Sequence, residues 1–252
     1  EAFADWHRKH NSGLEATVVP SRSSGLQSTF IPSGSAAPAH PHSTIGPYVI
    51  TGVLGHGGMG VVYSALHRRT SEPAAIKLVL PQLNATPQTL QIFLREASIL
   101  TGLKHPRIVA SREFGMHENR PYFVMEHVPV VDLEDILTTQ SPARRIRIVC
   151  KTICKVLEGL KFAHEQGIVH RDIKPSNILV YWAGSKLNCK LADFGLAKRF
   201  GDAGMSGLTG DNEIRGTMAY MPPEQLQDSR HARPLADIYA TGVCLYRYLA
   251  GT

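Results

Sequence analysis

The sequence predicts an α+β fold of two lobes, a small antiparallel β-sheet lobe that contains one helix and a larger lobe that is mostly helical. Short β-branched or aromatic runs, bounded by glycine, proline and polar turns, follow one another between residues 48 and 128, which is typical of strands. One segment among them, and most of the chain after Val128, has apolar residues at helical spacing. With 43% hydrophobic and 19% charged residues, the 252-residue chain has the composition of a globular protein.

Residues 1–46 are expected to form a flexible leader ahead of the two lobes. Between residues 11 and 46 serine, proline, glycine and alanine are abundant and large apolar residues are few, so burial cannot offset the entropy lost on ordering. The hydroxyl groups there are either phosphorylation sites or part of a plain solvated linker. Because the chain lacks an initiator methionine and stops at Thr252 directly after a helical pattern, we expect it to be a piece of a longer protein.

Residues 47–128 are expected to form the sheet lobe. Its strands are predicted in the runs YVITGVL, VVYSAL, AAIKLVL and PYFVMEHV. Between the third and fourth runs, Thr86 suits the cap and Pro87 the first position of a helix over LQIFLREASILTGL. The lobe is therefore predicted to be a small sheet with one helix.

Residues 129–252 are expected to form the helical lobe. Ser141 and Pro142 are a start signal for its first long helix. The apolar positions of that helix, expected to face the core, are Ile146, Val149, Cys150, Ile153, Leu157, Leu160 and Ala163.

The charge of the chain does not indicate a nucleic-acid partner. The formal net charge of +6 is modest for this length. Part of the excess lies on the predicted helix, at Arg144, Arg145, Arg147, Lys151 and Lys155. A solvated helix face explains these side chains better than a nucleic-acid surface.

The cysteines and the hydropathy pattern indicate the redox compartment of the protein and whether a membrane segment is expected. The four cysteines form no CxxC pair, so neither a zinc site nor a disulfide framework is indicated, and a reducing cytosol fits. Cys150 and Cys154 share a helical face and are expected to fill the core rather than bind metal. The sequence contains no apolar run of about 18 to 20 residues and no signal pattern, so no membrane segment is expected.

A glycine-rich segment, LGHGGMGVVY, places Gly55, Gly57 and Gly60 in a GxGxxGxV pattern that ends at Val62. A dinucleotide-binding turn would open a helix, whereas this segment continues into a predicted strand. A hairpin that covers phosphate groups is therefore favoured, because glycines let the backbone approach phosphate oxygens. An ordinary glycine-rich hairpin is the alternative.

Lys77 lies among apolar residues in a predicted strand, where an unpaired ammonium would cost several kcal/mol. Glu96 lies on the apolar face of the following predicted helix. Because the two charges are opposite and both lie in apolar surroundings, Lys77 and Glu96 are expected to form an ion pair. The simpler alternative is that one or both side chains reach solvent.

Two further motifs, IVHRDIKPSNIL and LADFGLAK, complete a pattern in which the chain resembles the eukaryotic-type protein kinase superfamily. The order of glycine-rich hairpin, lysine, helix glutamate, HRD with an asparagine five residues after the aspartate, and DFG is highly specific. The resemblance covers residues 45–252 and is closest to the bacterial branch. It implies a protein-kinase-like fold whose helical lobe is incomplete after the central helix, PLADIYATGVCLYRYLAGT, in which Asp237 braces the catalytic loop.

The resemblance implies a catalytic set that acts on ATP with Mg²⁺, or with Mn²⁺ as an alternative ion. Gly55, Gly57 and Gly60 would cover the phosphates, and Lys77, held by Glu96, would fix the α- and β-phosphates.

The same resemblance gives roles to the residues of the HRD and DFG motifs. Asp172 would accept or orient the substrate hydroxyl, Lys174 would approach the transferred phosphate, and Asn177 and Asp193 would hold the metal. Lys174 is typical of Ser/Thr kinases, so the acceptor is expected to be Ser or Thr.

Binding of adenosine and stacking between the lobes are implied by further matches. Residues implied to surround the nucleotide are Leu54, Val62, Ala75, Met125, Glu126, Val128 and Asp132. His170, Phe194 and Leu100 match positions that stack between the lobes, and they are equally compatible with ordinary core residues.

An activation segment is implied between Asp193 and Glu224. Thr217 would help to position the substrate hydroxyl, and Arg171 would grip a phosphorylated loop residue. Ser206 and Thr209 are the candidate phosphosites, with unmodified loop hydroxyls as the alternative.

The chain departs from the family pattern at Pro129–Val131, where glycines are common, at Pro222, and in its missing C-terminal helices, which leave Glu224 without its usual arginine.

The resulting hypothesis is a protein Ser/Thr kinase that acts on protein substrates. It is expected in the cytoplasm or as the cytoplasmic part of a membrane-anchored protein. The alternatives are a pseudokinase that binds nucleotide or docks partners, and a kinase of small molecules. Oligomeric state, substrate and activating signal do not follow from the sequence.

Overall fold

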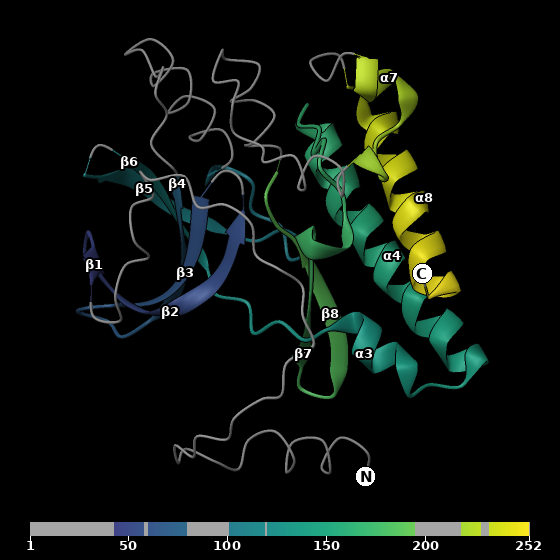
Figure 1. The fold of residues 1–252 in the computed structure, drawn as a ribbon, viewed down its shortest axis with the longest axis horizontal. Coiled ribbons are helices and arrows are strands. Elements are labelled where there is room, and N and C mark those ends of the chain that lie inside the picture. The colour runs from purple at the N-terminus through teal and green to yellow at the C-terminus, as the bar shows by residue number, and fades with distance from the viewer. Residues whose placement is uncertain are drawn as a thin grey trace, which may run out of the picture. The chain divides into compact units, whose positions relative to one another are not determined.

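The computed structural model describes residues 43–57, 60–79, 101–118, 120–194, 218–227 and 232–251. They form an antiparallel sheet followed by a mostly helical region (Figure 1). The strands of the sheet are β1 (Thr44–Ile45), β2 (Tyr48–Gly57), β3 (Gly60–His67), β4 (Pro73–Val79), β5 (Ser111–His117) and β6 (Arg120–Glu126). This arrangement confirms the predicted fold class for the described residues.

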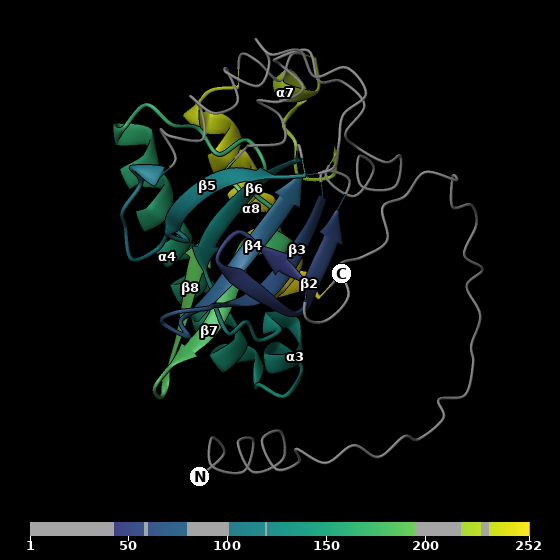
Figure 2. The ribbon, with the colours of Figure 1, turned by 90° about the vertical axis from the view of Figure 1, so that its left-hand side faces the viewer.

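The sheet has the strand order β1-β2-β3-β4-β6-β5, and every neighbouring pair is antiparallel (Figure 2). Its core forms because alternate residues of β2, β3, β4 and β6 point to one side, where they are removed from water. The buried residues of this core are Ile45, Tyr48, Ile50, Tyr63, Ala65, Ala74, Ile76, Leu78, Tyr122 and Val124.

Two features of the sheet differ from the prediction. The sheet includes residues before residue 47, because Ile45 pairs with Tyr48 and is only 1% exposed. Strand β5 was not predicted, because its sequence, SREFGMH, lacks an alternating apolar pattern. It lies at the edge of the sheet, where polar side chains remain in water and only one neighbour supplies hydrogen bonds.

The helical region contains four helices among the described residues, α3 (Leu133–Thr138), α4 (Pro142–Glu165), α7 (Pro223–Gln227) and α8 (Pro234–Ala250), with a short 3₁₀ helix η1 (Pro175–Asn177). Helix α4 begins as predicted, with Ser141 at the cap position and a proline in the first turn. Helices α4 and α8 lie side by side and share one core, to which Val149, Val156 and Cys244 contribute (Figure 1).

The buried face of α4 differs from the predicted face. Ile146 is 52% exposed, and Cys150 and Cys154 are exposed as well. The buried residues are Val149, Thr152, Ile153, Val156, Gly159, Leu160 and Ala163. The prediction included apolar residues on both flanks of the stripe, and those on one flank, about 100° away from the core direction, face water.

The cysteines that fill the core are Cys189 and Cys244. Burial raises the pKa of the Cys189 thiol to about 11 and that of Cys244 to about 12. Both thiols therefore stay protonated near neutral pH and act as small apolar side chains.

The basic residues of α4 do not all belong to a solvated face. Arg144, Arg147 and Lys151 are exposed, as predicted. Lys155 instead donates to the carbonyl of Leu187, and Arg145 donates to the carbonyl of Tyr248 through Nε at 3.1 Å and Nη2 at 2.9 Å. These two side chains tie α4 to other elements.

A two-stranded hairpin, β7 (Ile178–Ala183) and β8 (Lys186–Leu191), lies within the helical region and was not predicted. It connects to the sheet lobe because Val109 N–H donates to the Leu191 carbonyl at 2.9 Å and Leu191 N–H donates to the Arg107 carbonyl at 2.8 Å. No helix in the described part of the chain is both long enough and apolar enough to span a membrane.

Candidate active site

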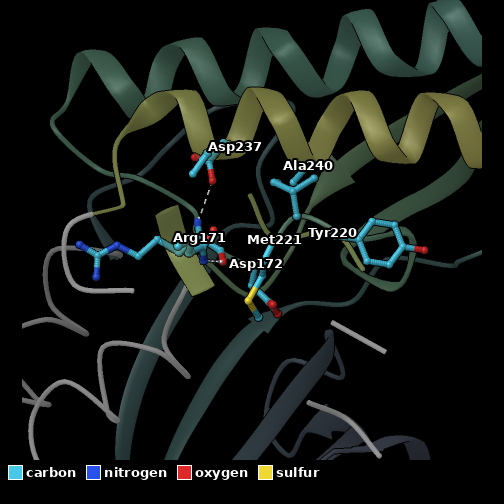
Figure 3. Close-up of a pocket in the computed structure, with 9 residues that line it drawn as sticks. Arg171, Asp172, Tyr220, Met221, Asp237 and Ala240 are labelled. Carbon is cyan, nitrogen blue, oxygen red and sulfur yellow. Dashed lines mark hydrogen bonds between the residues drawn. The ribbon is translucent and has the colours of Figure 1, made fainter. Parts of the chain in front are cut away.

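The loop between α4 and η1 carries the HRD motif in a strained backbone conformation. Arg171 has φ of 68°, in the left-handed region that side chains other than glycine seldom adopt. Asp237, from the first turn of α8, accepts a hydrogen bond from the main-chain N–H of His170 at 2.8 Å. It accepts a second one from the main-chain N–H of Arg171, also at 2.8 Å (Figure 3). Asp237 thus holds the main chain of the catalytic loop, which is the role that the resemblance implied for it.

The carboxylate of Asp172 contacts two of the residues predicted to act with it. Asn177 Nδ2 lies 3.0 Å from Asp172 Oδ2 and 2.7 Å from the Asp172 carbonyl oxygen. Lys174 Nζ lies 3.1 Å from the same carboxylate oxygen. Helix η1 brings Asn177 back toward the loop, so Lys174 and Asn177, which follow Asp172 within six positions of the sequence, both contact its carboxylate.

His170 is fully buried, and burial lowers the pKa of its imidazole even though nearby carboxylates oppose this. A neutral ring has one donor and one acceptor nitrogen. Because Nε2 lies 2.9 Å from the Ala192 carbonyl, the proton is assigned to Nε2, and Nδ1 accepts from Asp172 N–H at 3.3 Å. The ring also packs on Phe194, with centroids 4.4 Å apart.

Lys77 pairs with Asp193 across the two regions, with Nζ 2.7 Å from Oδ2. Lys77 is 8% exposed, so the expectation that its ammonium needs a partner is met by Asp193 among the described residues. Burial, the largest single influence, would raise the pKa of Asp193. The Lys77 ammonium, through its charge and its hydrogen bond, acts together with the electrostatic influence of His170 and Lys174 and lowers this pKa overall. Glu96, the partner predicted for Lys77, lies outside the described residues.

The glycine-rich segment forms the hairpin end of β2 and β3, with Gly55 opposite Val62 and Gly57 opposite Gly60. A Cβ atom at Gly60 would lie 2.1 Å from the Leu78 carbonyl oxygen, so packing against β4 requires a glycine there. A Cβ at Gly55 would meet no atom within 4 Å. Packing therefore explains Gly60 and leaves Gly55 unexplained.

The residues predicted around adenine lie on adjacent strands. Ala75 pairs with Met125 across β4 and β6, and Val62 pairs with Lys77 across β3 and β4. Leu54, next to Gly55, is 51% exposed. Val62, Ala75 and Met125 therefore lie on the face of the sheet that carries Lys77.

The end of β6 links the sheet to the helical region through Glu126 and a partner, Lys190, that the sequence did not reveal. Glu126 Oε1 accepts from Ala110 N–H at 2.7 Å and from Lys190 Nζ at 2.5 Å. Asp132, predicted near ribose, caps α3 by accepting from Glu134 N–H at 2.7 Å. Lys190 belongs to no recognised motif, and its contact with Glu126 follows from the pairing of β8 with β7.

Sequence reasoning also missed His164 and Gln225. His164 Nε2 lies 2.7 Å from Asp237 Oδ2, and Gln225 Nε2 donates to the Arg171 carbonyl at 2.7 Å. Both contacts join segments more than fifty residues apart, so local spacing gives no signal for them.

Arg171 lines a pocket together with Tyr220, Met221 and Ala240. Figure 3 shows its side chain extending away from Asp172 and from Tyr220. The other predicted regulatory residues, Ser206, Thr209 and Thr217, lie outside the described residues, as does Leu100.

Comparison with known families matches residues 48–252 to the protein kinase domain. The chain is 37% identical over 216 residues to the serine/threonine-protein kinase PknJ of Mycobacterium tuberculosis, covering 83% of this chain and 35% of that protein. It is 38% identical over 210 residues to PknB of the same species, covering 81% and 32% respectively. The chain thus spans about a third of the length of these relatives.

Among solved structures, the chain resembles the Mycobacterium tuberculosis PknI kinase domain, C20A_R136N double mutant, with a TM-score of 0.65 and 23% identity. The match covers 85% of this chain and 80% of that structure, and it supports the fold.

Proposed function

The chain belongs to the protein kinase family, and from this we propose that it transfers the γ-phosphoryl group of ATP to Ser or Thr hydroxyl groups of protein substrates. The observation that carries the proposal is the contact of Lys174 and Asn177 with one carboxylate oxygen of Asp172. These are the residue types that phosphoryl transfer requires at the acceptor side.

In this proposal Asp172 receives or orients the proton of the substrate hydroxyl. Asn177 holds the main-chain carbonyl of Asp172 as well as its carboxylate, which fixes the direction of the acceptor oxygen. Lys174 is placed to meet negative charge on the transferred group, because its ammonium already lies against the same carboxylate.

Asp193 and Asn177 fit a Mg²⁺ ion that arrives with ATP. One carboxylate and one amide oxygen suit Mg²⁺, which keeps several waters and takes its other ligands from phosphate oxygens. The low pKa of Asp193 keeps that carboxylate ionised. When bound, the ion would neutralise charge that develops on the transferred phosphoryl group.

Lys77 is proposed to fix the α- and β-phosphates, with Glu96 as its second partner. The open space at Gly55 supports approach of phosphate to the hairpin, because a side chain there would occupy it. Gly57 and Gly60 complete this cover.

Adenine is proposed to lie between the hairpin and the segment after β6. Residues proposed to contact it are Leu54, Val62, Ala75 and Met125, with main-chain groups of Glu126 to Val128. Asp132 would reach the ribose only by sharing its carboxylate with the cap of α3. Arg171, Ser206, Thr209 and Thr217 are proposed to act in regulation and substrate positioning. A location in the cytoplasm, or in the cytoplasmic part of a membrane-anchored protein, is proposed because the four cysteines form no CxxC pair.

The test is phosphate transfer from ATP and Mg²⁺ by the full-length protein, with Asp172→Asn in parallel. Panels of Ser-, Thr- and Tyr-containing peptides and of hydroxylated metabolites serve as acceptors, and intact mass reports self-phosphorylation. We expect transfer to Ser and Thr peptides that falls by at least about 100-fold in Asp172→Asn. Undiminished transfer by that variant would contradict the mechanism, and no transfer by either protein would favour the pseudokinase.

A further inference from the structure

The main-chain polar groups of Arg171 and Asp172 all have hydrogen-bond partners. Arg171 N–H donates to Asp237 Oδ1 at 2.8 Å, and Asp172 N–H donates to His170 Nδ1 at 3.3 Å. The carbonyl of Asp172 accepts from Asn177 Nδ2, and the carbonyl of Arg171 accepts from Gln225 Nε2, each at 2.7 Å. Side chains from several elements therefore hold the main chain at Arg171 and Asp172.

The conformation that these contacts hold is costly. With φ of 68°, Arg171 occupies a region that costs about 1–3 kcal/mol for a residue with a side chain. Such a residue relaxes unless its surroundings fix it. Asp237 fixes the N–H side of Arg171, and Gln225 fixes the carbonyl side.

Gln225 is suited to this task by its burial and its chemistry. It is 4% exposed and comes from α7, which lies against the loop in the pocket lined by Arg171, Asp172 and Asp237. A carbonyl oxygen accepts only, so the partner must donate, and the side-chain amide of Gln225 supplies an N–H. A carboxylate at this position would face the carbonyl with a second acceptor.

We infer that Gln225 is a positioning residue for phosphoryl transfer, which sets the direction of the Asp172 carboxylate by holding the Arg171 carbonyl. The inference rests on the proposed function. Helix α7 follows the segment between residues 195 and 217 in sequence, so Gln225 also connects the end of that segment to the catalytic loop.

The first experiment compares Gln225→Met with Thr241→Val in the full-length protein. Both variants remove one buried side-chain donor, but Thr241 donates to the Asp237 carbonyl within α8 and leaves Arg171 untouched. We expect kcat of Gln225→Met to fall by about 10- to 100-fold, with KM for ATP within about twofold, because misplacement affects the transfer step. Thr241→Val should keep kcat. Equal kcat in Gln225→Met and the natural protein, or equal losses in both variants, would overturn the inference.

A second variant, Gln225→Glu, adds a pH readout. An ionised carboxylate cannot donate to the Arg171 carbonyl, whereas a protonated one can. We expect the ratio of its kcat to that of the natural protein to rise as the pH falls toward the pKa of the introduced carboxyl. A ratio that is independent of pH would contradict a role for the donated hydrogen bond.

Hydrogen–deuterium exchange separates this inference from the proposed function. The peptide that contains Arg171 and Asp172 should exchange faster in Gln225→Met than in the natural protein, while peptides of β2 and β3 should not change. Unchanged exchange in the loop would refute the positioning contact. If the natural protein transferred no phosphate but the loop still loosened in the variant, the proposed function would fail, while the contact by which Gln225 holds the loop would stand.

Discussion

Burial and nearby charges decide the protonation state of single residues in the site. Asp193 would hold its proton more tightly in this buried position, but the Lys77 ammonium lowers its pKa and keeps it ionised. His170 has no counter-ion strong enough to overcome burial, so it stays neutral and uses one nitrogen to donate and the other to accept. Both groups are therefore deprotonated near neutral pH, Asp193 as a charged carboxylate and His170 as a neutral ring.

The lowered pKa of His170 predicts that stability decreases at acidic pH. Its unfolded-state pKa is about 6.5, so below that pH the unfolded chain binds a proton that the folded chain resists. The contribution of His170 is complete above about pH 6.5 and is lost as the pH falls, by up to about 1.4 kcal/mol per pH unit. Urea unfolding of the natural protein and of His170→Phe at several pH values measures this difference.

His170→Phe has no titratable proton and keeps a ring that can stack on Phe194. Its free energy of unfolding should therefore depend less on pH than that of the natural protein. The same acid slope in both proteins would contradict the assignment of a neutral His170.

At the scale of single residues, the sequence predicts contacts between residues that are close together in the chain. Asp172, Lys174 and Asn177 lie within six positions, and a single turn brings them into contact. Gln225 meets Arg171 across 54 positions and Lys190 meets Glu126 across 64, so no spacing rule could join them.

The sequence predicts helices and strands well where an element has one apolar face and where its first residues favour a cap. Ser141 and Pro142 marked the start of α4 correctly. Strand β5 was missed because an edge strand needs no alternating apolar pattern, and its pairing with β6 decides its conformation. The hairpin of β7 and β8 shows that a strand pair can lie within a lobe whose other elements are helices.

The contact between Glu126 and Lys190 joins β6 to β8, so it is a link between elements. Both side chains are mostly buried, with 24% and 16% of their surfaces exposed, and Glu126 also accepts from Ala110 N–H. We expect a coupling free energy of about 1–3 kcal/mol in a double-mutant cycle of Glu126→Gln and Lys190→Met, measured by urea unfolding.

The control for this cycle is the exposed pair Lys161 and Glu165, four positions apart on α4 at 3.8 Å. Its coupling between Lys161→Met and Glu165→Gln should stay below about 0.5 kcal/mol. Equal coupling in the two cycles would show that the link between β6 and β8 adds nothing beyond a surface ion pair.

At the scale of the whole molecule, the sheet and the helical region meet through polar contacts and through apolar packing, because Leu103 and Ile108 belong to the core of the helical region. Lys77 reaches Asp193, Glu126 reaches Lys190, and the main chain of Arg107 and Val109 pairs with Leu191. A ligand that binds both regions should therefore stabilise the folded protein as a unit.

We predict that ATP with Mg²⁺ raises the melting temperature. At a ligand concentration of about 100 times Kd the gain is about 2.7 kcal/mol, which corresponds to roughly 5–10 °C for a domain of this size. In Asp193→Asn the part of the shift that depends on Mg²⁺ should disappear, while the part given by ATP in the presence of EDTA should remain. Scanning calorimetry measures both, and an undiminished magnesium effect in the variant would contradict the metal role of Asp193.

The contact between Asp237 and the catalytic loop has a consequence for the order of folding during synthesis. The ribosome produces Arg171 and Asp172 more than sixty residues before the carboxylate that holds them. A nascent chain that ends before Pro234 already contains Asp172, Lys174 and Asn177, yet it lacks the acceptor that offsets the strain at Arg171. The proposed catalytic residues are thus made first, and their geometry is completed only when α8 has emerged.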